Sequence, residues 1–162
     1  KQELGADIAT AGFAFAAFSG IMALMRFLGD GVRNRFGAVN TLRVSALLAA
    51  TGMLAAGFAP NPLIAIAAFA ICGLGVANMV PIAFSAAGNQ PGVPPGIGMS
   101  VVTTMGYSGI LVAPSAIGFV AQYTGFAPVF VALSALLVVV CLMAGLARHA
   151  DFRAVAQPAP AE

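Results

Sequence analysis

Charged residues are scarce in this chain of 162 residues: seven are Lys or Arg and five are Asp or Glu, which is 7% of the sequence. Soluble domains carry about 25% charged residues because their surfaces must be hydrated. With 60% of its residues hydrophobic, the chain cannot build such a surface. The composition therefore excludes a soluble globular domain and predicts a protein whose solvent is lipid.

Cysteine is scarcer still. The two cysteines, Cys72 and Cys141, both lie inside long apolar runs, where a free thiol behaves as a small apolar side chain. We expect neither of them to form a disulfide or to bind a metal. The sequence thus predicts no cofactor, no metal site and no nucleic-acid partner.

Long apolar runs are what the sequence has in abundance. A helix needs about 20 apolar residues to cross a bilayer core, and we predict five such segments, at residues 8–28, 41–59, 62–84, 99–121 and 127–147. They are rich in Ala, Gly and Ser, which allow close helix packing in lipid. The alternating pattern of a membrane β-strand is absent. The predicted fold is all-α, a polytopic bundle of five transmembrane helices.

The orientation of the bundle is predicted from its basic residues. They are concentrated around the first connection and after the fifth segment, at Arg26, Arg33, Arg35, Arg43, Arg148 and Arg153. Because short cytoplasmic loops carry an excess of Lys and Arg, we expect both places to lie in the cytoplasm. Residues 1–7 then form a periplasmic connection, and residues 148–162 form a cytoplasmic tail whose composition predicts disorder. The first residue is not Met and no signal peptide follows it, so we expect a piece of a longer protein.

Helix boundaries and a kink are also marked in the sequence. Asn61 before Pro62 is typical of a cap followed by the first helical residue. Asn40 or Thr41 can cap the helix that begins near residue 41. Pro81 predicts a kink in the third helix.

Residues 26–37 carry the densest charge of the chain. Three of the seven basic residues and one of the five acidic residues lie there, between two apolar segments. Asp30 can accept hydrogen bonds from a helix N-terminus or pair with a nearby arginine, while Gly29 and Gly37 permit tight turns. Such a cluster can hold two helices together in one conformational state and release them in another. The alternative is a simple basic anchor at the membrane surface.

This stretch resembles the signature loop of the major facilitator superfamily, Gly-Arg-x-x-Gly-Asp-x-x-x-x-Arg-x-Gly. Met25 and Gly31 depart from the family's pattern, where a glycine and a basic residue are usual. The matching residues are Arg26, Gly29, Asp30, Arg35 and Gly37.

A second region supports the same resemblance. The segment containing Gly109, Pro114 and Gly118 is similar to the glycine-proline motif of the family's eleventh helix, where Pro114 is expected to bend the helix. The resemblance implies that the five segments are helices eight to twelve of a transporter in a bacterial inner membrane. The chain is similar to members grouped with sugar permeases and efflux carriers, and the resemblance implies a missing N-terminal half.

Polar residues inside the apolar segments are candidates for binding a solute. The spacing of Thr104, Tyr107 and Ser108 places them on one face of a helix, and Asn78 offers an amide in the third segment. Polar groups within a bilayer normally face the bundle interior or an aqueous cavity. The resemblance implies that the eighth, tenth and eleventh helices line the central cavity, so we predict that these four residues lie near the substrate. Hydrogen bonding between helices is the alternative.

The predicted function is transport of a small organic solute, sugar-like or drug-like, by alternating access. A membrane scaffold that transports nothing is the alternative. An intramembrane serine protease is a remote one, because Gly106-Tyr-Ser108-Gly109 matches a Gly-x-Ser-Gly turn and His149 is the single histidine. Since Ser108 lies near the middle of its helix and His149 at the membrane edge, we expect no enzyme.

Overall fold

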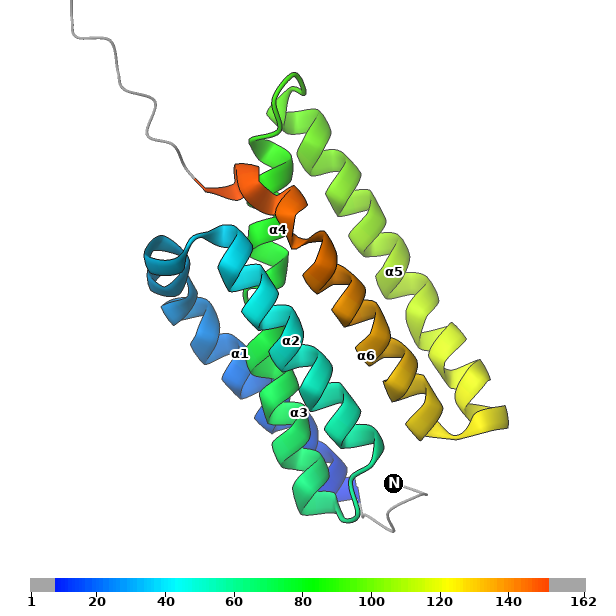
Figure 1. The fold of residues 1–162 in the computed structure, drawn as a ribbon. Helices are drawn as coiled ribbons and strands as arrows, with labels where there is room; N and C mark the ends of the chain where they lie inside the picture. The colour runs from blue at the N-terminus through cyan, green and yellow to red at the C-terminus, as the bar shows by residue number, and fades with distance from the viewer. Residues whose placement is uncertain (1–7, 152–162) are drawn as a thin grey trace, which may run out of the picture.

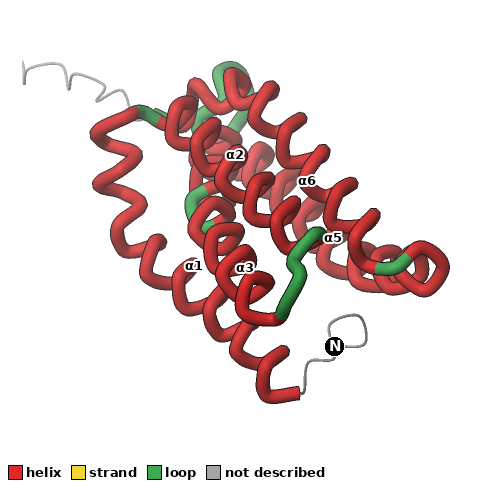
Figure 2. The backbone as a smooth tube through the Cα atoms, turned by 60° about the horizontal axis from the view of Figure 1, so that its bottom comes forward, coloured by secondary structure: helices red, strands yellow, loops and turns green. Residues whose placement is uncertain are grey.

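The structure is a computed structural model that describes residues 8–151, and these residues form helices without any strand (Figures 1 and 2). The elements are α1 (Ile8–Phe36), α2 (Ala38–Gly57), α3 (Pro62–Val76), α4 (Met79–Gly88), α5 (Pro95–Thr124), α6 (Phe126–Met143) and the 3-10 helix η1 (Ala144–Ala150). Among them, α1, α2, α3 with α4, α5, and α6 with η1 make five helical spans long and apolar enough to cross a membrane. The predicted all-α bundle of five such helices is confirmed.

Several helices extend beyond the predicted segments, and two of these extensions concern the basic residues. The first segment was expected to end at residue 28, whereas α1 continues to Phe36, so most of the signature stretch is helix and not loop. The tail was expected to begin at residue 148, whereas η1 continues to Ala150. Basic residues occupy the last turn in both cases, Arg33 and Arg35 in α1 and Arg148 in η1, where they interact favourably with the carbonyl end of a helix. Residues 1–7 and 152–162, assigned to the periplasmic connection and the tail, lie outside the described residues.

One predicted helix cap is confirmed and the other is wrong. The Asn61 side chain accepts a hydrogen bond from the backbone N–H of Ile64 at 3.0 Å, as expected for the cap of α3. The second helix, however, begins at Ala38 and not near residue 41. Its N-cap is Gly37, and the Asn40 side chain donates backward to the Phe36 carbonyl at 3.2 Å.

Helix α2 lies at the centre of the packing. It packs against α3 on one side and α6 on the other, while α1 packs against α3 (Figure 1). The close approach of α2 and α3 depends on Gly75, because a Cβ atom there would collide with the backbone of Ser45 and Ala49. On the other side, the buried Ser134 hydroxyl donates to the Ala50 carbonyl at 2.8 Å and joins α6 to α2. Small residues therefore set the helix spacing, as expected in lipid.

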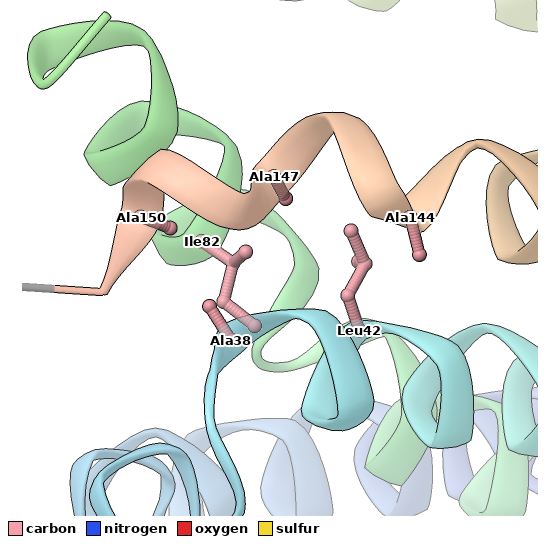
Figure 3. Packing of buried hydrophobic residues seen from close by; sticks show 6 residues of the cluster. All are labelled: Ala38, Leu42, Ile82, Ala144, Ala147 and Ala150. Atoms are coloured by element: carbon pink, nitrogen blue, oxygen red, sulfur yellow. The ribbon is translucent and has the colours of Figure 1, made fainter.

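A small apolar cluster joins three elements at one end of the bundle, which we call the basic end because Arg33, Arg35, Arg43 and Arg148 lie there. Leu42 of α2 and Ile82 of α4 pack against η1 in this cluster (Figure 3). The remaining members are alanines, at positions 38, 144, 147 and 150. The cluster brings the start of α2, the helix α4 and the end of η1 together.

The third membrane span is broken at Ala77 and Asn78, between the end of α3 and the start of α4. Asn78 has φ −96° and ψ −9°, away from ideal helix geometry. Pro81 follows and has no N–H to donate to the Ala77 carbonyl four residues earlier. The break lies where a kink was predicted.

Candidate functional site

The signature stretch ends in a sharp turn between α1 and α2. Gly37 has φ 77° and ψ 157°, a conformation that is essentially restricted to glycine. Arg26 and Arg35 are exposed on α1, and the Arg35 guanidinium lies 5.7 Å from the centre of the Phe36 ring. Asp30 belongs to α1, but its side chain lies outside what the structure describes. The gating roles predicted for Arg26, Asp30 and Arg35 therefore stay predictions.

Arg33, which the family pattern does not include, makes long-range hydrogen bonds from this stretch. Its guanidinium donates to the Ser85 hydroxyl of α4 at 2.9 Å and to the backbone carbonyl of Ala150. The Ser85 hydroxyl donates to the same carbonyl at 2.9 Å. Since Ala150 is the last residue of η1, the two donors satisfy a carbonyl of the kind that a helix end leaves free.

Asp151, the residue after η1, makes a second contact between this end of the chain and the start of α2. Its carboxylate accepts a hydrogen bond from the backbone N–H of Ala38, the first residue of α2, at 2.7 Å. Gly37 has no side chain to cap α2, so Asp151, 113 positions after Ala38, supplies the cap. A carboxylate at a helix N-terminus also interacts favourably with the helix dipole.

Together these contacts form what we call the clasp, made of Arg33, Gly37, Ser85, Ala150 and Asp151. It ties the end of α1 and the start of α2 to α4 and to the end of η1. Sequence reasoning missed its side-chain members. The one signal available was that α2 starts after a glycine that cannot cap it, which leaves a backbone donor to be satisfied from elsewhere.

Asn78 contacts the signature stretch at Gly29. It is buried, and its amide oxygen sits directly against Gly29, where a Cβ atom would collide with it. Asn78 also lines a pocket between α1, α2 and α3 together with Thr41 and Ser45. Gly29 of the signature stretch is thus required for the close approach of α1 to the helix break.

The other predicted solute-binding residues lie on α5. Tyr107 is 64% exposed, Thr104 and Ser108 are exposed as well, and the Ser108 hydroxyl donates to the Thr104 carbonyl at 2.8 Å. Among the described elements α5 packs only against α4 and α6 (Figure 1). The described chain therefore leaves this polar stripe uncovered, and it does not bring the stripe into the pocket that holds Asn78.

The glycine-proline motif is also on α5. The helix runs without a break through Pro114, and a Cβ atom at Gly109 or Gly118 would meet nothing within 4 Å. The packing role implied for these residues has no partner in the described part of the chain and stays a prediction.

The described geometry does not join Ser108 and His149 into a nucleophile and base. Ser108 lies on α5 and donates to Thr104, whereas the His149 ring lies on η1. The Nδ1 atom of that ring is buried and has no hydrogen-bond partner among residues 8–151.

Comparison with known proteins gives a consistent result. The family model described as Major Facilitator Superfamily matches residues 1–162. The chain is 37% identical over 140 residues to an uncharacterised MFS-type transporter of Yersinia pestis, covering 86% of this chain and 36% of that protein. It is 36% identical over 136 residues to the membrane protein MosC of Rhizobium meliloti, covering 83% of this chain and 33% of that protein.

A third relative is an uncharacterised transporter of Sinorhizobium fredii, 29% identical over 119 residues, covering 74% of this chain and 32% of that protein. The chain thus spans about a third of the length of these curated relatives. No solved structure matches it.

Proposed function

Because this chain belongs to the major facilitator superfamily, we propose that it forms the C-terminal part of a transporter for a small organic solute. Its five spans correspond in this proposal to helices eight to twelve of the family, and the missing N-terminal half is their partner. Transport proceeds by alternating access, in which two halves rock about a site near the middle of the membrane. The basic end faces the cytoplasm of a bacterial cell, across the inner membrane.

The observation that carries the proposal is the uncovered polar stripe on α5. Polar groups in a bilayer face the bundle interior or water. A helix face that carries a tyrosine, a threonine and a serine is therefore not expected to face lipid. Thr104, Tyr107 and Ser108 are exposed in a chain that spans about a third of its relatives. We assign them to the surface that faces the solute path and the other half.

The assigned chemistry is hydrogen bonding to a solute with hydroxyl or similar polar groups. Tyr107 offers a phenol that both donates and accepts, and Thr104 offers a hydroxyl. This favours a sugar, a sugar acid or an amphipathic drug-like molecule. Asn78, the fourth residue predicted to lie near the substrate, is buried against Gly29 at the break between α3 and α4 and lies apart from this stripe.

The gate is assigned to the signature stretch at the basic end. Arg26, Asp30 and Arg35 stabilise one state of the cytoplasmic gate, while the clasp holds the helices of this half at a constant spacing. Asp30→Asn in the complete protein is expected to slow transport while membrane insertion stays normal. Unchanged transport would contradict the gating role.

Uptake into proteoliposomes that contain the complete protein tests the function. A panel of radiolabelled sugars, sugar acids and amphipathic organic cations is compared with empty liposomes, and at least one solute is expected to accumulate. Tyr107→Phe is expected to lower its uptake about threefold to tenfold, the loss of one hydrogen bond. Tyr123→Phe, at an exposed tyrosine of the same helix that packs edge-to-face against Phe119, is the matched control.

The outcomes separate the proposals. Absence of uptake for every solute favours a membrane scaffold. Equal uptake by the Tyr107→Phe and Tyr123→Phe variants would contradict a solute contact at Tyr107 on α5. Fluorescence of a green fluorescent protein fused to the C-terminus checks the orientation, because this reporter folds in the cytoplasm and not after export.

A further inference from the structure

A pocket of about 260 Å³ lies between α1, α2 and α3 at the basic end of the bundle. Its described lining residues come from all three helices and carry no charge, and most of them are apolar. Four are polar: Asn40, Thr41, Ser45 and Asn78. The clasp and the uncovered stripe on α5 are made of other residues.

Three of these polar side chains are almost completely removed from solvent. Thr41 is 4% exposed, Ser45 6% and Asn78 7%. Thr41 and Ser45 are one turn apart on α2 and share a face, and Asn78 reaches the pocket from the helix break. The Thr41 hydroxyl oxygen has no hydrogen-bond partner among residues 8–151. A buried hydroxyl in this position needs a partner that the neighbouring side chains do not supply.

Water fits both the chemistry and the size of the pocket. A buried water typically makes about three hydrogen bonds, and each water takes up about 30 Å³ in the liquid. The pocket can therefore hold several waters. Hydroxyl and amide groups both donate and accept, so water can bridge them in either sense. Thr41 lies near the start of α2, so the pocket is close to the basic surface from which water can enter.

We propose that this pocket is a binding site for ordered water, which bridges Thr41, Ser45 and Asn78 beside the break between α3 and α4. Water pairs the buried polar groups at a point where the span bends. Small movements of α4 relative to α3 then exchange one set of water contacts for another, and no buried polar group is left unpaired. Only this consequence for α4 rests on the proposed transport function, whereas the hydration does not.

Hydroxyl-radical footprinting of the complete protein tests the hydration directly. Radicals generated by brief X-ray irradiation oxidise methionines that touch water and spare those in dry packing. Met25 lines the pocket. Met53, which is half-buried like Met25 and lies on α2 outside the lining, is the internal reference. We expect rapid oxidation of Met25 relative to Met53.

Variants identify the groups that hold the water. Thr41→Val combined with Ser45→Ala is expected to abolish most of the Met25 oxidation, because the pocket then lacks two of its hydrogen-bonding groups. Thr51→Val is the matched control, since the Thr51 hydroxyl is exposed on the same helix and bonds to the carbonyls of Leu47 and Leu48. It is expected to leave the labelling unchanged.

Two results would overturn the inference. Protection of Met25 in the unmodified protein means that an apolar group fills the pocket, whether a lipid chain or a side chain from the rest of the transporter. Strong Met25 oxidation that the double variant does not reduce means that the polar groups do not hold the water. Neither result depends on solute uptake, so failure here is distinguishable from failure of the proposed function.

Discussion

Removal of the Asp151 carboxylate tests whether the end of η1 caps α2 from a distance. The carboxylate accepts from the Ala38 N–H at 2.7 Å, and Gly37 offers no side chain in its place. Replacing a capping residue with Ala costs about 0.5–2 kcal/mol, and a charge at a helix N-terminus adds about 0.3–1 kcal/mol. Because Asp151 is exposed, we expect Asp151→Ala to lower the free energy of unfolding by about 1–2 kcal/mol.

Asp151→Asn separates the hydrogen bond from the charge. The amide oxygen can still accept from Ala38, so only the charge interaction, about 0.3–1 kcal/mol, is expected to be lost. The assay is reversible unfolding of the complete protein in mixed micelles by titration with sodium dodecyl sulfate, followed by circular dichroism. The expected order of stability is Asp, then Asn, then Ala.

Arg148→Gln is the matched control for these variants. Arg148 is an exposed residue of η1, three positions before Asp151, and its replacement changes the local charge without touching the cap. It is expected to change stability by less than about 0.5 kcal/mol. If Asp151→Ala were as stable as the unmodified protein, or if Arg148→Gln lost as much, the long-range cap would be refuted.

The same unfolding titration checks three further expectations, and the yield of folded protein checks a fourth. Gly37→Ala should cost about 1–3 kcal/mol because of its backbone conformation, and a neutral result would contradict the turn geometry. Ser134→Ala should cost about 0.5–1.5 kcal/mol through its lost bond to the Ala50 carbonyl; stability equal to the unmodified protein would mean the bond contributes nothing. Arg33→Gln should destabilise by about 1.5–3 kcal/mol through its charged contacts. An equal loss of stability in Arg35→Gln, its control, would contradict the role of Arg33 in the clasp. Gly75→Val should prevent stable packing of α2 on α3, which normal yields of folded protein in detergent would disprove.

The fold class and the membrane setting could be predicted from the sequence because they depend on local properties. The length of an apolar run decides whether a helix crosses a bilayer, and each of the five runs can be counted without knowing its neighbours. The cap at Asn61 was predictable for the same reason, since the capping side chain and the capped N–H are three residues apart. The signature stretch likewise identified the family from a dozen consecutive residues.

The candidate site was predicted less completely, because its contacts join residues far apart in the chain. The sequence pointed to Arg26 and Arg35, whereas the described long-range hydrogen bonds of this stretch are made by Arg33 on α1. A sequence pattern shows which residues are charged but not which side of a helix will meet another element. That side is decided when α4 and η1 pack on the start of α2.

The length and spacing of apolar runs by themselves determined that this protein is a helical membrane bundle. Whether a helix can cross the bilayer core depends on its number of consecutive apolar residues, which the sequence shows directly. Only the tertiary structure decided that Asp151 caps α2, that Arg33 and Ser85 meet the end of η1, and that Asn78 packs against Gly29. These pairings join residues 49 to 117 positions apart. They exist because small side chains let the helices approach closely enough for distant polar groups to come within hydrogen-bonding distance.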